Sequence, residues 1–188
     1  MKLPRRIKGW LSAESAPEQL LERYYTKGER SALARVVECY NRDVFHYLLS
    51  LSDEELAKDV LQMTWLKVIN HKGSHQFTHA KSWLFSIARR SLIDELRKTK
   101  HFVDITEDTH AFHSQTLQSE LELADRVKLF NDALLKLNFF QREAIIFQQE
   151  GFSLTEIAQL TDESFETVKS RLRYGKNHLK ILLGHTDE

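Results

Sequence analysis

The feature that most constrains this chain is the scarcity of helix-breaking residues after its first few positions. Both prolines, Pro4 and Pro17, lie within the first seventeen residues, and only six glycines occur among 188 residues. Proline and glycine are the residues that most often end helices and form turns. Hydrophobic residues make up 41% of the chain, which is enough for globular cores. We therefore predict an all-α protein.

Apolar residues recur every three or four positions in several segments, which is typical of amphipathic helices. The first of these helices begins at Pro17 and is broken by Gly28. On the third, we expect Val60, Val68 and Ile69 to be buried together. The predicted helices before residue 150 cover residues 17–27, 31 to about 52, 54–70, 80–100, 121–137 and 140–149.

An acidic segment suggests how the helices are divided between domains. Residues 104–122 contain five acidic residues, no Lys or Arg, and little apolar periodicity, so we expect a flexible linker over 104–120. Residues 1–16 should form a flexible basic arm, 17–103 a first small helical domain, and 121–188 a second one.

The second domain carries the sequence pattern of a helix-turn-helix from about residue 153 to residue 180. Ser153 and Glu156 have the spacing of a capping box, which starts a helix. Asp162 tolerates the left-handed conformation that a tight turn requires, and Ser164 is suited to cap the second helix.

Charge is balanced over the whole chain, with 27 basic and 27 acidic residues, but it is unevenly distributed. Residues 79–100 and 164–180 each carry a net charge of +4. Segregated positive charge on a helix that follows a turn is what a reader of the DNA major groove requires. The alternative is a capped helical hairpin whose basic face is only solvated. The candidate DNA-binding residues of the second helix are Lys169, Ser170, Arg171, Arg173, Tyr174 and Lys176.

Cysteine use and hydropathy point to the cytoplasm. Cys39 is the single cysteine, so no disulfide can form within the chain. The basic start of the chain is not followed by an apolar run of signal-peptide length, and no stretch approaches the length of a membrane span. We expect a cytoplasmic protein that inserts into no membrane and needs no cofactor.

Three histidines raise a different possibility, a metal-dependent hydrolase. His71, His75 and His79 are spaced by four residues, which on a helix could place metal ligands on one face. Gly73 and the polar surroundings favour a loop instead, and no HExxH motif or nucleophile triad accompanies them. We therefore expect solvated histidines, no metal site and no enzymatic activity.

Two separate motifs resemble the sigma factors, the promoter-recognition subunits of bacterial RNA polymerase. The run from Gln141 through Gly151-Phe-Ser-Leu-Thr-Glu-Ile-Ala to Thr167-Val-Lys-Ser-Arg-Leu resembles their fourth conserved region. The runs beginning at Asp59 and at Ser82-Trp-Leu-Phe-Ser-Ile-Ala-Arg-Arg are similar to the second region of the small extracytoplasmic-function (ECF) subgroup. The two motifs stand in the order typical of the family.

The resemblance implies a role for each part. Asp59 and Gln62 would bind the clamp helices of the polymerase β′ subunit, and the second domain would also meet the β flap. The C-terminal helix would read the -35 promoter element, with Arg171 and Lys176 on phosphates. The residues that would melt and hold the -10 element are Phe77, Trp83, Arg89, Arg90, Arg97 and Lys98. Members of the family are often paired with an anti-sigma factor, which is a further implied partner beside promoter DNA.

Two positions depart from the family pattern. Met63 stands where the family often has Glu, and Arg90 stands where it often has Asn. The first position bears on polymerase binding and the second on the pocket for a -10 base. From the residues alone, Trp83 is also suited to core packing. A helix-turn-helix regulator, with an N-terminal domain that senses a ligand or dimerises, remains the second functional hypothesis.

Overall fold

The structure of the protein is a computed structural model that describes residues 16–72, 77–98 and 129–184. Every regular element in these residues is a helix, which confirms the predicted all-α class. The helices are α1 (Pro17–Lys27), α2 (Arg30–Leu49), α3 (Glu54–Ile69), α4 (Ala80–Lys98), α7 (Phe139–Gln149), α8 (Leu154–Thr161) and α9 (Phe165–Leu182). Residues 129–135 are also helical.

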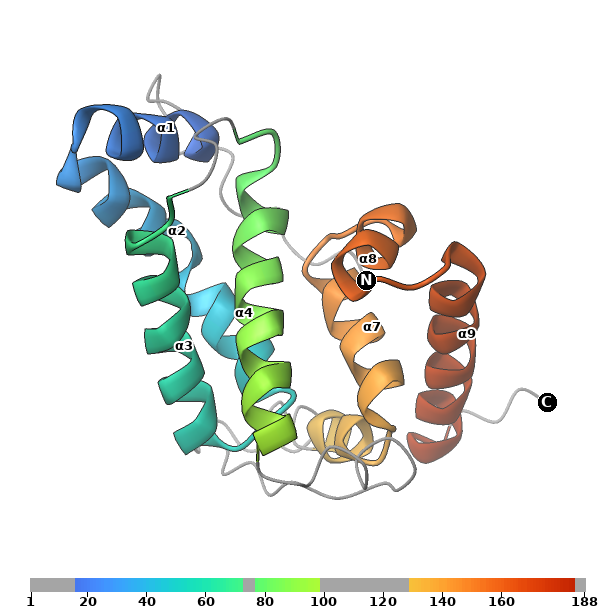
Figure 1. The fold of residues 1–188 in the computed structure, drawn as a ribbon. Helices are drawn as coiled ribbons and strands as arrows, with labels where there is room; N and C mark the ends of the chain where they lie inside the picture. Colours follow the sequence, from blue (N-terminus) through green and yellow to red (C-terminus); the bar gives the residue numbers. More distant parts are fainter. Residues whose placement is uncertain (1–15, 73–76, 99–128, 185–188) are drawn as a thin grey trace.

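The first four helices form an N-terminal bundle. Figure 1 shows α2, α3 and α4 side by side, with α1 lying across one end. Pro17 occupies the first turn of α1, and Gly28 ends that helix with a positive φ of 66°, a conformation that glycine adopts without strain. Asp53 caps α3 by accepting a hydrogen bond from the Leu56 backbone N–H at 2.8 Å.

The C-terminal helices pack as a second unit, in which α9 lies against both α7 and α8. Asn138 caps α7 by accepting from the Gln141 N–H at 2.9 Å. The expected helix over 121–137 is described from residue 129 and ends at 135. The expected linker over 104–120 lies outside the described residues.

The two units are in direct contact and share one hydrophobic core. The cluster of buried side chains that contains Val44 and Leu92 of the N-terminal bundle also contains Phe147, Ile157 and Leu172. Figure 1 shows α4 between α3 on one side and α7 with α8 on the other. The sequence indicated two domains but gave no sign that α4 packs on both sides.

One expected core residue is exposed. Val60 and Val68 are buried as predicted, but Ile69 is 46% exposed. It lies on the last turn of α3, on the same side as Leu66, which is 56% exposed. The prediction of a buried Ile69 was therefore wrong, because the apolar pattern of α3 continues onto a face that no described element covers. No helix in the described parts of the chain is both long and apolar enough to cross a membrane.

Candidate nucleic-acid interface

The helix-turn-helix is fixed by caps on both of its helices. Ser153 and Glu156 form the predicted capping box: the Ser153 N–H donates to the Glu156 carboxylate at 2.8 Å, and the Glu156 N–H donates to the Ser153 hydroxyl at 3.3 Å. Hydrogen bonds from the Ser153 backbone and hydroxyl lower the pKa of the Glu156 carboxyl. Ser164 caps α9 by accepting from the Thr167 N–H at 3.0 Å. Both helix starts are thus defined by local hydrogen bonds.

The turn between α8 and α9 has the predicted geometry. Asp162 takes a left-handed conformation with a φ of 57°, and its N–H bonds to the Ala158 carbonyl. Val168 and Leu172 hold the inner face of α9 in the core. The outer face of α9 is therefore held in a fixed orientation.

A close crossing with α7 further restrains α9, at a position that the sequence did not single out. A Cβ atom placed on Gly175 would lie 2.8 Å from Ile145 Cδ1 and 3.3 Å from Gln141 Cβ. Only a residue without a side chain allows α7 and α9 to approach this closely. The available signal was a glycine within the helix, three residues after Leu172 on the apolar face.

The outer face of α9 presents most of the predicted DNA-binding residues to solvent. Lys169, Arg173, Tyr174 and Lys176 are exposed, and Ser170 is half-buried. The Arg173 guanidinium lies over the Tyr174 ring at 4.7 Å and donates to its hydroxyl at 3.0 Å. This surface combines positive charge, hydrogen-bond donors and an aromatic ring.

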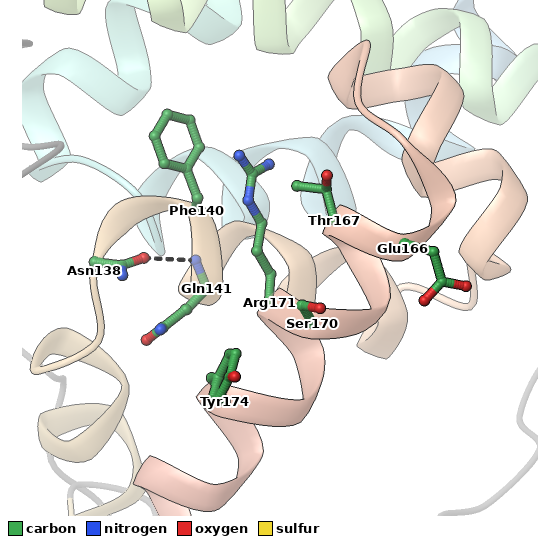
Figure 2. Close-up of a pocket in the computed structure, with 8 residues that line it drawn as sticks. All are labelled: Asn138, Phe140, Gln141, Glu166, Thr167, Ser170, Arg171 and Tyr174. Carbon is green, nitrogen blue, oxygen red and sulfur yellow. Dashed lines mark hydrogen bonds between the residues drawn. The ribbon is translucent and has the colours of Figure 1, made fainter.

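Arg171 lies apart from that exposed face. Its side chain is 19% exposed, donates to the Glu163 carboxylate at 2.7 Å, and lies 4.5 Å from the centre of the Phe140 ring. Figure 2 shows it between α9 and the start of α7, at an open pocket of about 470 Å³ that Ser170 and Tyr174 also line. Arg171 therefore already has an internal partner.

The basic residues predicted on α4 are divided in the same way. Arg90, Arg97 and Lys98 are exposed, and Lys98 pairs with Glu95 at 2.7 Å. Arg89 is only 15% exposed, because it lies against the C-terminal unit and not in solvent.

The two aromatic candidates near the start of α4 belong to a packed cluster. The Phe77 and Trp83 rings meet edge to face with centroids 4.8 Å apart. Tyr25 of α1 stacks on Phe77 at 5.6 Å, and the His71 ring meets Trp83 at 5.2 Å. Phe77 and Trp83 are half-buried, so each retains an open side.

The candidate polymerase-binding residues lie on an exposed face of α3. Asp59 and Gln62 are both exposed, and their spacing continues to Leu66 and Ile69 at helical intervals of three and four. Met63 is half-buried and packs on the core. The sequence motif identified the polar half of this face but not its apolar half.

Two of the three histidines that raised the possibility of a metal site, His71 and His79, lie within the described residues. No cluster of three His, Cys, Asp or Glu side chains occurs there. His71 instead contacts aromatic rings, His79 is exposed, and His75 lies outside the described residues.

Comparison with known proteins gives the chain its family. Residues 36–102 match the family described as Sigma-70 region 2. The ECF RNA polymerase sigma factor SigM of Bacillus subtilis (strain 168) is 29% identical over 150 residues, which cover 78% of this chain and 92% of that protein. The ECF RNA polymerase sigma factor SigM of Mycobacterium tuberculosis (strain H37Rv) is 30% identical over 166 residues, covering 86% of this chain and 82% of that protein.

A solved structure agrees with these relatives. The sigma factor RpoE from Bartonella quintana, in complex with the anti-sigma factor NepR, superimposes with a TM-score of 0.62 and 28% identity over 82% of this chain and 98% of that one. Sequence, family match and fold converge on one conclusion: this chain belongs to the ECF RNA polymerase sigma factors.

Proposed function

We propose that this sigma factor directs core RNA polymerase to promoters by holding the DNA at two places. In this proposal, α9 reads the -35 element in the major groove, while α4 and the loop before it hold the -10 element. The observation that carries the proposal is the outer face of α9, whose basic and aromatic side chains are exposed on a capped, tightly packed helix. A fixed helix with solvent-exposed donors is what base readout requires.

At the -35 element, we assign base contacts to Lys169, Ser170, Arg173 and Tyr174. Lys176, one turn further along the exposed face, is assigned to the phosphate backbone. Arg171 is also assigned to a phosphate, and its guanidinium would exchange the Glu163 carboxylate for the phosphate oxygens. That exchange is chemically matched, because arginine pairs with both groups through the same fork of donors.

At the -10 element, the half-buried rings of Phe77 and Trp83 offer aromatic surface to an unstacked base. Arg90, Arg97 and Lys98 supply exposed positive charge along the same helix. Arg89 is assigned to the DNA backbone in the state that binds the promoter. Arg90, in place of the Asn that the family often has, should give this protein its own preference at the flipped base.

The exposed face of α3 is the proposed site for the β′ clamp helices. Asp59 and Gln62 supply its polar contacts, and the uncovered Leu66 and Ile69 supply apolar area beside them. An exposed apolar strip with a polar rim is typical of protein interfaces. We assign the β flap to the C-terminal unit. Because its target is RNA polymerase, we place the protein in the cytoplasm, and we expect an anti-sigma factor to regulate it.

The decisive experiment is transcription from fragmented genomic DNA by purified core enzyme, with and without this protein, followed by sequencing of the transcripts. We expect a set of start sites that appears only with the protein and shares two sequence elements at a fixed spacing. Asp59→Ala should reduce all transcripts alike through weaker polymerase binding. Stable DNA binding without retention on core polymerase, and no new start sites, would favour a plain helix-turn-helix regulator.

A further inference from the structure

Helix α4 meets the C-terminal unit through an ordered set of contacts, which we call the α4–α7 ladder. On α4 it consists of Lys81, Phe85 and Arg89, spaced by four residues, so that they share one helix face. Across from them lie Glu143, Phe147 and Glu150 of α7 and its C-terminal end. Ionic contacts stand at both ends of the ladder and aromatic rings stand between them.

The Arg89 end of the ladder is the more deeply buried. Arg89 Nε and one terminal nitrogen donate to the two oxygens of Glu143 at 2.9 and 3.2 Å. The Tyr47 hydroxyl of α2 donates to the same carboxylate at 3.1 Å. The Glu143 side chain is 1% exposed. One carboxylate of the C-terminal unit is thus fully occupied by donors from the N-terminal bundle.

The other two levels complete the contact. The Phe147 ring stacks on Tyr47 at 4.9 Å with an angle of 19° between planes, and Phe85 meets Phe147 at 6.3 Å. At the far end, Lys81 Nζ donates to the Glu150 carbonyl at 2.6 Å and to its carboxylate at 3.0 Å. Each of the three α4 residues of the ladder therefore contacts a residue of the C-terminal unit.

The bidentate geometry at Arg89 is the one by which arginine also binds a phosphate. Glu143 therefore pairs with the same Arg89 donors that would bind a DNA phosphate. We propose that the α4–α7 ladder is a self-docking surface that holds the free protein closed and withholds Arg89 from DNA until the two units separate. The proposal rests on the assignment of α4 to the -10 element made above.

The test measures the distance between the units in the free, full-length protein. A donor and an acceptor dye are attached to Cys39, the exposed cysteine of α2, and to an exposed α9 position as Asn177→Cys. We expect high energy transfer in the otherwise unchanged protein. Glu143→Gln and Arg89→Gln should each raise the equilibrium constant for opening by about tenfold or more, because each leaves a buried polar group unpaired.

The two changes should be strongly non-additive, since both break the same pair. The matched control is Glu54→Gln, which removes an exposed ion pair to Lys58 within α3 and should leave energy transfer unchanged. Tyr47→Phe is a milder variant that removes one donor to Glu143 and keeps the ring. Circular dichroism of each variant verifies that the helices are intact.

A second readout uses a randomised pool of single-stranded DNA. Glu143→Gln, which frees Arg89, should bind the pool about tenfold more tightly than the parent, in step with its opening. Unchanged energy transfer in both Glu143→Gln and Arg89→Gln, with helices intact, would overturn the proposal, as would opening without tighter binding. If neither parent nor variants bind the pool, the -10 assignment fails, while energy transfer still decides whether the ladder holds the units together.

Discussion

Helices α4 and α9 start from the same local surplus of positive charge, and the fold uses that charge in opposite ways. On α4, Lys81 and Arg89 are paired with carboxylates of the C-terminal unit. On α9, Lys169 and Arg173 point outward from a helix whose inner face is in the core. The comparison shows that positive charge on a helix does not by itself indicate an exposed basic surface. The elements packed against the helix decide whether the charges face solvent or pair with carboxylates. It also separates polar groups that are buried in a contact between the units from polar groups that are exposed to solvent.

The largest expected effect contrasts two tyrosines: Tyr47 of α2, which contacts Glu143 and Phe147 of the C-terminal unit, and Tyr174 on the outer face of α9. Tyr47 is fully buried, whereas Tyr174 is 55% exposed. Tyr47→Ala should lower the free energy of unfolding by about 3–5 kcal/mol through loss of a buried ring, and Tyr174→Ala by less than about 0.5 kcal/mol. Urea denaturation of both variants measures this. Similar losses from the two variants would show that the contacts of Tyr47 contribute little to folding.

The next effect concerns base recognition by α9. In the holoenzyme, Arg173→Ala should cost about 1–3 kcal/mol of promoter binding and relax preference at particular -35 bases. Lys176→Ala should weaken binding to all DNA sequences alike. It should also lower, by about 1, the slope of the logarithm of affinity against the logarithm of salt concentration. Binding to a library of -35 sequences at several salt concentrations separates the two. If both variants lose the same affinity for every -35 sequence, Arg173 contacts the DNA backbone and not the bases.

A third prediction tests the crossing of α7 and α9. Gly175→Leu should destabilise the protein by about 1–3 kcal/mol, since a side chain there meets Ile145 and Gln141. Lys176→Leu, the adjacent exposed position on the same helix, is the matched control and should change stability by less than about 0.5 kcal/mol. Thermal unfolding of both gives the difference. Equal stabilities would mean that α7 and α9 can move apart at little cost.

The smallest effect is local to the start of α8. Ser153→Ala should cost about 1 kcal/mol at neutral pH by removing a cap. Because the pKa of Glu156 is lowered in the folded protein, its contribution is present above the unfolded pKa and is lost as the pH falls through the lower pKa of the folded state. In the Glu156→Gln variant, the free energy of unfolding should therefore fall less steeply as the solution is acidified. If it falls as steeply as in the parent, the carboxylate does not stabilise the cap.

Much of the fold could be predicted because its signals are local. The capping box at Ser153, the left-handed Asp162 and the Ser164 cap follow from residue types a few positions apart, and the structure has all three. Helix periodicity likewise predicted α3 to within a residue, and α2 to within a few residues at its C-terminal end. These features depend on neighbours along the chain, which the sequence displays directly.

The remaining features depend on residues far apart in the chain. Arg89 and Glu143 are separated by 54 positions, and neither the pairing nor the burial of Glu143 has a local signature. Arg171 was grouped with the exposed basic residues because its periodicity does not reveal Phe140 beside it. Ile69 was predicted to be buried because it is apolar, and its sequence position does not show that no described element packs against it. At both positions, the sequence alone does not show what lies across the helix face.

The division of labour on α9 also bears on how promoter preference can change over evolution. Val168, Leu172 and Gly175 carry the packing of the helix, while Lys169 and Arg173 contact little of the core. If the outer face reads DNA as proposed, substitutions there would alter the preferred DNA sequence at small cost in stability. A gene duplicate could acquire a new set of promoters through a few changes on that face, with the rest of the fold kept as it is.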